Sequence, residues 1–216
     1  MPEAAERKEL KSTGYELFIG ILSILSIFNL VLIYVTDDPN LDEVILAMNA
    51  LLSAIFLADF TYRLFTAESK SRYFFRQYGW ADLLACIPIE QVKILRIFRL
   101  VRVFRLLRAS GAKNMMRSLL TDRAESALLT LLLMGILVLE FGSLQILHIE
   151  QYQPGANITT ASDALWYVIV TISTVGYGDR YPVTNNGRLL GTLIIVVGVG
   201  IFGTFTGYLA NLFLSP

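Results

Sequence analysis

Long apolar runs constrain this 216-residue chain more than any other feature of its sequence. About 20 helical residues, at ~1.5 Å rise each, cross the ~30 Å hydrocarbon core of a bilayer. Runs of this kind occupy residues 17–35, 44–65, 127–148 and 189–214. The chain is 55% hydrophobic, a proportion that a soluble domain rarely reaches. We therefore expect an all-α protein embedded in a membrane.

Two weaker segments are also predicted to cross the membrane. Residues 80–89 are apolar but too short alone, and they reach spanning length only together with residues 73–79. Residues 93–108 follow after a very short turn. Residues 163–173 are apolar but too short to cross, and they run directly into a glycine-containing segment. Such a helix is allowed at membrane depth where protein or water covers the backbone, so we expect it to be re-entrant.

The first span carries a mildly polar stripe and no acidic residue. Ser23, Ser26 and Asn29 repeat at helical spacing, so this stripe is expected to face protein rather than lipid. Residues 36–43, which follow the span, are acidic and contain the turn-forming Pro39. We therefore expect a short acidic loop, with the second helix beginning at residue 44.

The distribution of Lys and Arg predicts the orientation, because cytoplasmic loops carry an excess of these residues. The loop after the first span has none, whereas the loop after the second has Lys70, Arg72 and Arg76. Arg180 and Arg188 fall on the outer side against this rule, but they are outnumbered. Six crossings then place both chain ends in the cytoplasm and the glycine-containing segment at the outer face.

Six basic residues recur at every third position of the fourth predicted span. They are Lys93, Arg96, Arg99, Arg102, Arg105 and Arg108. Burying one such charge costs at least ~2.5 kcal/mol, so six in one span need an explanation. They spiral slowly around an α-helix and line one face of a 3₁₀-helix, and either geometry presents each in turn to a fixed partner. A helix lying on the membrane surface or binding nucleic acid would have a clean apolar face, which this spacing does not give.

Acidic partners for these charges are found in the second and third spans. Phe56, Asp59 and Arg63 form the pattern F-x-x-D-x-x-x-R, and Asp82 lies in the third span. Asp59 and Arg63 are four residues apart and so share a helix face, with Phe56 about one turn away. An acid pair beside an aromatic ring that keeps water from crossing is what a passing guanidinium requires. We infer that the basic helix moves past this group.

The segment Thr174, Val175, Gly176, Tyr177, Gly178 and Asp179 carries the clearest chemical signal. Glycine adopts backbone conformations closed to other residues, so this segment can be extended with its carbonyls turned to one side. Stacked rings of such carbonyls can replace the water around a dehydrated K⁺, and this string resembles the selectivity filter of potassium channels. K⁺ would bind at Thr174, Val175, Gly176 and Tyr177. One chain supplies one strand of each ring, so we expect a homotetramer.

With these features, the chain from about residue 15 to residue 213 resembles a six-transmembrane voltage-gated potassium channel subunit of the compact, prokaryotic-like kind. The resemblance implies that Phe56, Asp59 and Asp82 form the gating-charge transfer centre. It also implies that Arg96 to Arg108 are the sensor arginines. The family often has an acid seven residues before the phenylalanine, where this chain has Asn49. Together with the lack of an acid in the first span, this leaves fewer partners for the outer charges.

The resemblance extends to the pore helix, where the family pattern D-A-x-W-W-x-x-x-T is matched by Asp163, Ala164, Trp166, Tyr167 and Thr171. It implies that Trp166 reaches Asp179 and that the Tyr167 hydroxyl donates to Tyr177. Glu150 matches an acid that ties the outer pore together. Glu140 is expected to be structural. Gly198 lies where the family has its hinge glycine, with close helix packing as the other explanation.

These expectations define four regions of the chain. They are a cytoplasmic segment (1–14), a four-helix voltage-sensor bundle (15–108), a linker (109–123) and a two-helix pore module with its re-entrant helix and filter (124–216). The resemblance implies a voltage-gated, K⁺-selective channel in the plasma membrane, in contact with membrane lipids. It requires no cofactor and no nucleic acid, since K⁺ is the permeant ion.

Two alternative functions remain to be considered for this chain. The first alternative is a K⁺ channel gated mainly by a ligand or another stimulus, through a cytoplasmic regulatory domain or subunit outside this chain. The second is a membrane-embedded hydrolase or transporter. It is disfavoured because neither G-x-S-x-G nor H-E-x-x-H occurs, His148 is the sole histidine, and the two halves show no repeat. We therefore expect that the chain is not an enzyme. The basic helix leaves open whether depolarisation or hyperpolarisation opens the pore.

Overall fold

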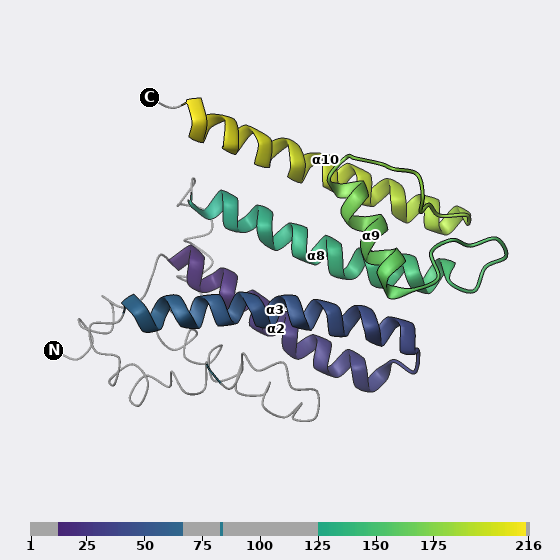
Figure 1. Cartoon of the computed structure of the whole chain (residues 1–216), viewed down its shortest axis with the longest axis horizontal. Coiled ribbons are helices and arrows are strands. Elements are labelled where there is room, and N and C mark those ends of the chain that lie inside the picture. The colour runs from purple at the N-terminus through teal and green to yellow at the C-terminus, as the bar shows by residue number, and fades with distance from the viewer. Residues whose placement is uncertain (1–12, 67–82, 84–124, 215–216) are drawn as a thin grey trace. The chain divides into compact units, whose positions relative to one another are not determined.

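The computed structural model describes residues 13–66, 83 and 125–214 of the chain. Regular structure within these ranges is α-helical (Figure 1). The helices are α2 (Thr13–Val35), α3 (Pro39–Thr66), α8 (Glu125–Glu150), α9 (Ala161–Ile172) and α10 (Asn185–Leu214). The helices α2, α3, α8 and α10 are long and apolar enough to span a membrane, whereas α9 is shorter. The all-helical membrane architecture is therefore confirmed for this part of the chain.

The remaining predicted elements lie outside the described residues. They are the spans at residues 73–89 and 93–108 and the linker at residues 109–123. The described residues belong to two compact units, one of residues 1–35 and 47–126 and the other of residues 36–46 and 127–216.

In the first unit, α2 and α3 run in opposite directions (Figure 1). Their contact is apolar, because residues spaced three or four apart on each helix are buried together. The buried apolar side chains include Phe18, Leu22, Leu25, Met48, Leu52, Phe56 and Phe60. The polar stripe of Ser23, Ser26 and Asn29 is fully buried, and the Ser26 hydroxyl donates to Asn49 Oδ1 over 3.3 Å. The stripe therefore faces protein, as predicted.

Both helices begin earlier than the sequence suggested. Helix α2 starts at Thr13 instead of residue 17, so its first turns contain the buried Glu16. The prediction of a first span without an acid is therefore wrong. Helix α3 starts at Pro39, because proline suits the first helical position and the Asp38 carboxylate accepts the Asn40 N–H over 3.0 Å. The acidic loop is thus confined to residues 36–38.

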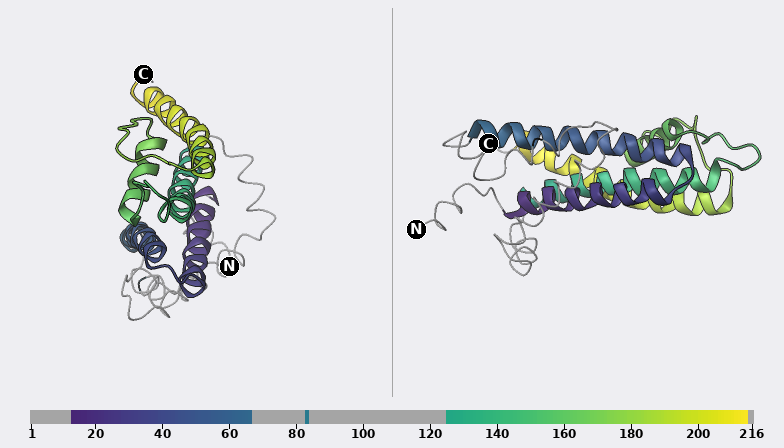
Figure 2. Two further views of the ribbon diagram at one scale, coloured as in Figure 1. Left: turned by 90° about the vertical axis from the view of Figure 1, so that its right-hand side faces the viewer. Right: turned by 90° about the horizontal axis from the view of Figure 1, so that it is seen from below.

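In the second unit, the short α9 packs against the longer α10 (Figures 1 and 2). A capping box starts α9: the Asp163 N–H donates to the Thr160 hydroxyl, and the Thr160 N–H donates to the Asp163 carboxylate. At its carboxyl end, α9 packs so closely on α10 that a Cβ on Gly198 would lie 2.7 Å from Ile172 Cα. Glycine is thus required where these helices touch.

Candidate functional site

The segment from Thr174 to Asp179 directly follows α9 and has an alternating backbone. The φ angle is 60° at Thr174, 60° at Gly176 and 76° at Gly178, and of the described residues other than glycine, Thr174 alone has a positive φ. A β-branched residue in this region is strained by ~1–3 kcal/mol, which proteins retain mainly at functional sites. Alternation between left-handed and ordinary φ turns successive carbonyls toward the same side of the segment.

Hydrogen bonds fix the start of this segment to the end of α9. The N–H groups of Val175 and Gly176 both donate to the Val170 carbonyl, over 3.1 and 3.3 Å, and the Thr174 N–H donates to the Thr171 carbonyl over 3.1 Å. These bonds use the N–H groups of the segment and the last carbonyls of the helix. The partial negative charge of the helix end is directed at the same place.

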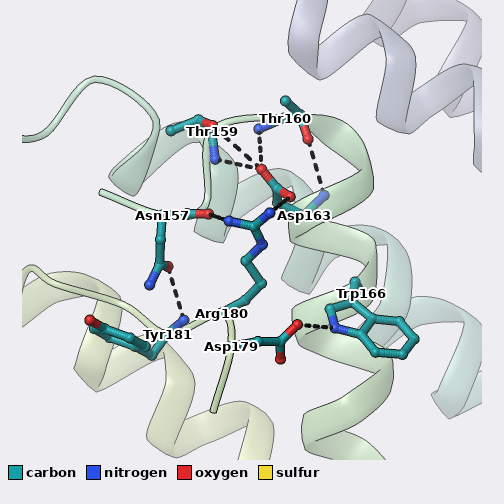
Figure 3. Close-up of polar contacts among 8 residues, drawn as sticks. All are labelled: Asn157, Thr159, Thr160, Asp163, Trp166, Asp179, Arg180 and Tyr181. Carbon is teal, nitrogen blue, oxygen red and sulfur yellow. Dashed lines mark hydrogen bonds and ion pairs between the residues drawn. The ribbon is translucent and has the colours of Figure 1, made fainter. Parts of the chain in front are cut away.

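Trp166 holds the other end of the segment. Its indole N–H donates to Asp179 Oδ2 over 2.8 Å, which is the contact predicted for this pair (Figure 3). Its ring stacks on Tyr177 with 5.8 Å between the ring centroids. The neighbouring Tyr167 is buried and faces α10, where its hydroxyl lies 2.5 Å from the place of a Cβ on Gly191. The predicted bond from Tyr167 to Tyr177 stays a prediction.

Arg180 is a participant that the sequence did not reveal. Its guanidinium pairs with Asp163 Oδ1 through Nη2 over 2.8 Å and donates through Nη1 to the Asn157 carbonyl over 2.6 Å. The next residue, Tyr181, donates its N–H to Asn157 Oδ1 over 3.1 Å (Figure 3). The sequence identified Arg180 only as an exception to the loop-charge rule. Its position next to Asp179 was the available signal.

The Asp163 carboxyl is held in its ionised form. Burial raises its pKa, but hydrogen bonds from the Thr159 and Thr160 region and the nearby Arg180 charge outweigh burial. The pKa of Asp163 is therefore below its ordinary value of 3.8. An Asp163 carboxylate that is ionised near neutral pH is the partner that a guanidinium requires.

Glu150 ties the end of α8 to the start of α10. Its fully buried carboxylate accepts the Val183 N–H over 2.8 Å, the Thr184 N–H over 3.1 Å and the Thr184 hydroxyl over 2.6 Å. A Cβ on Gly187 would overlap the Glu150 carboxylate, so glycine is needed there. Glu140, three turns earlier in α8, is fully buried as well.

A second polar group lies at the beginning of α3. Asp38 Oδ2 accepts the Gln151 side-chain N–H over 2.6 Å and the Tyr152 hydroxyl over 3.1 Å, and the Asn40 amide donates to Gln151 Oε1 over 3.0 Å. Burial raises the pKa of Asp38, but the hydrogen bonds that it accepts outweigh burial and lower the pKa below its ordinary value. The start of α3 and the residue before it are thereby fastened to the residues that directly follow α8.

In the first unit, four polar side chains meet near the start of α2 and the end of α3. Arg63 pairs with Asp59 Oδ1 through Nε and with Glu16 Oε1 through Nη1, each over 2.8 Å. The Tyr15 hydroxyl donates to Asp59 Oδ1 over 2.7 Å. Phe56 is buried about one turn away on α3. Asp59 and Arg63 share a helix face, as predicted, and they form a local ion pair with each other. The contacts of Glu16 and Tyr15 with this pair were not predicted.

The other residues expected in a charge pathway lie outside the described residues. They are Asp82, Lys93, Arg96, Arg99, Arg102, Arg105 and Arg108. Gly198, within the described part, is buried in one continuous helix, and its contact with Ile172 supports the packing explanation.

Comparison with known proteins gives one family match, the ion transport proteins, over residues 12–215. The chain is 33% identical over 78 residues to a voltage-gated potassium channel of Aeropyrum pernix, an alignment that covers 36% of this chain and 26% of that protein. It is 30% identical over 145 residues to a putative potassium channel protein of Rhodopseudomonas palustris, an alignment that covers 62% of this chain and 34% of that protein. It is 37% identical over 86 residues to a calcium-gated potassium channel of Thermoplasma volcanium, an alignment that covers 39% of this chain and 25% of that protein. The chain thus spans about a quarter to a third of the length of these curated relatives.

Proposed function

Because the chain belongs to the ion transport protein family, we propose that four copies of it form a potassium-selective channel whose opening depends on membrane voltage. The family also makes it a multi-pass membrane protein and a channel component instead of an enzyme, in agreement with the sequence. The observation that carries the proposal is the backbone of residues 174–179, with its alternating φ angles at the end of a short helix.

Selectivity would come from the carbonyls of Thr174, Val175, Gly176 and Tyr177. Four such segments around one axis form rings of oxygens that replace the hydration shell of K⁺. The strained Thr174 and the left-handed glycines support this role, because their backbone conformations turn the carbonyls to one side and that of Thr174 costs energy. The helix α9 acts as the re-entrant pore helix, and its carboxyl end favours a cation in the cavity below.

Voltage dependence would come from the basic residues between positions 93 and 108. They move past Phe56, Asp59 and Asp82 when the field changes. Support comes from the first unit, where acidic side chains are buried among helices that span the membrane. One charge crossing the field is worth ~2.3 kcal/mol per 100 mV, so roughly three charges in each of four subunits supply about 28 kcal/mol. That is ample for steep gating.

The proposed orientation follows from the loop charges. Both chain ends face the cytoplasm, residues 150–160 and 180–184 face outward, and the channel resides in the plasma membrane among its lipids. No cofactor is needed, since the permeant K⁺ is the ligand of the filter.

A second candidate is a K⁺ channel gated mainly by a ligand. The calcium-gated relative and the small share of each relative that this chain covers favour it. In that case the basic helix would contribute little, and a cytoplasmic domain or subunit would control the pore.

The filter assignment is tested by Gly176→Ala in the purified tetramer. A Cβ at φ 60° is strained, so the carbonyl at this position must turn and K⁺ selectivity should be lost. Gly135→Ala is the matched control, since Gly135 lies within α8 and its Cβ would meet nothing within 4 Å. Permeability to K⁺ and Na⁺ is measured from reversal potentials in planar bilayers. A Gly176→Ala channel as selective as the unmodified protein would refute the assignment.

A further inference from the structure

The outer end of the filter segment is attached to α9 at two successive points. Asp179 binds Trp166, and the next residue, Arg180, binds Asp163 (Figure 3). Asp163 and Trp166 are three residues apart and so lie on the same side of the helix, about one turn from each other. Two attachments one turn apart fix an orientation, whereas a single hydrogen bond allows the segment to pivot.

The Arg180 guanidinium also reaches a second element. Nη1 donates to the Asn157 carbonyl while Nη2 pairs with Asp163, so one side chain joins the loop before α9 to the first turn of α9. The planar guanidinium suits this double contact, and a lysine ammonium does not reproduce its fixed geometry. Tyr181 adds a backbone hydrogen bond to Asn157.

The burial of this group indicates a geometric role. The Arg180 side chain is 37% exposed and the Asp163 side chain 12% exposed. An ion pair this close to water contributes little net stability. Its directed bonds nevertheless restrict where residues 179–181 can lie, and the Asp163 charge offsets a positive charge that would otherwise stand at the outer mouth.

We propose that Arg180 is a positioning residue for the filter, holding Asp179 in register with Trp166 through its contacts with Asp163 and Asn157. This inference rests on the proposed function. The inference goes beyond the proposed function because it assigns to an arginine outside the filter a role in keeping the filter carbonyls aligned.

The test measures two properties of the tetramer in planar bilayers. One is the K⁺ over Na⁺ permeability ratio, and the other is the persistence of the current, defined as the time for which it lasts while the opening voltage is maintained. Arg180→Gln should lower the ratio or shorten the persistence by about tenfold, the effect of losing one charge-assisted hydrogen bond. Arg188→Gln is the matched control, because Arg188 is an exposed arginine on the same side that makes no contact with the filter among the described residues. It should behave as the unmodified protein does.

A double variant separates position from charge. Arg180→Gln with Asp163→Asn keeps the net charge of the mouth, so a purely electrostatic effect would be reversed in it. The positioning role predicts that the double variant stays impaired. If Arg180→Gln does not assemble, Arg180→Lys decides, since an intermediate loss supports the role and full retention of selectivity overturns it.

The possible failures are distinguishable. An unmodified channel without K⁺ selectivity would contradict the proposed function. A selective unmodified channel in which Arg180→Gln retains both selectivity and persistence would overturn the role of Arg180 alone.

Discussion

Removal of the Glu150 carboxylate gives the most direct test of how the end of α8 is held to the start of α10. This side chain accepts three hydrogen bonds, from the backbone N–H groups of Val183 and Thr184 and from the Thr184 hydroxyl. It is fully buried, so these three hydrogen bonds are shielded from bulk water. Glu150→Ala leaves these donors without their partner and removes the link between α8 and the start of α10.

The size of the effect follows from this count. A hydrogen bond to a charged group contributes ~1.5–3 kcal/mol, and a donor left unsatisfied in the interior costs ~1–3 kcal/mol. The three bonds share one carboxylate and are not additive, so we expect a loss of about 3–5 kcal/mol for Glu150→Ala. Glu150→Gln should lose less, because its amide oxygen can still accept two bonds while its NH₂ faces the third donor.

The assay is thermal unfolding of the purified protein in detergent, followed by helical circular dichroism. A loss of about 3 kcal/mol corresponds to a fall of roughly 6–12 °C in Tm for a chain of this size. The exposed Gln153 provides the control, since Gln153→Ala alters the loop directly after α8 but keeps the Glu150 carboxylate and the backbone hydrogen bond from Gln153 to Glu150. If Glu150→Ala melted at the same temperature as Gln153→Ala, the carboxylate would not be what holds residues 183 and 184 to α8.

Three further predictions concern other parts of the chain. Glu16→Gln and Arg63→Gln should shift the half-opening voltage in opposite directions, because the first removes a negative charge and the second a positive charge from the same buried group. Shifts of the same sign would contradict this prediction. Gly198→Ala should destabilise the second unit by ~1–3 kcal/mol in thermal unfolding, whereas Gly200→Ala, whose Cβ meets nothing within 4 Å, should not. The lowered pKa of Asp163 contributes stability that is present above pH 3.8 and lost as the pH falls through the pKa of the folded state; Asp163→Asn should therefore lose less stability on acidification, and an equal loss would refute this.

Much of the fold could be predicted because spanning helices are encoded locally. Length and hydropathy identify α2, α3, α8 and α10 without knowledge of their partners. The helix starts were less predictable. Glu16 reads as part of a polar tail until its partner Arg63, on another helix, is known. The start of α3 had a local signal, since Asp38 followed by Pro39 is typical of a helix beginning, but the acidic run obscured it.

The contacts of the candidate site likewise include some that the sequence predicts and others that it does not. The contact between Trp166 and Asp179 belongs to a contiguous sequence pattern, so it could be predicted from the sequence. The contacts of Arg180 and of Asp38 depend on loops brought together by the tertiary structure. No spacing rule links residue 38 to residue 151. Such pairs become visible only in three dimensions.

Current through the purified protein in a planar bilayer, with K⁺ on one side and Na⁺ on the other, tests the central claim most directly. The membrane is stepped over both voltage polarities. The account predicts a reversal potential near that for K⁺ and an open probability that changes steeply with voltage. A reversal potential near zero would contradict the filter assignment. A K⁺-selective current that is indifferent to voltage would contradict the sensor role of the basic helix and favour a ligand-gated channel.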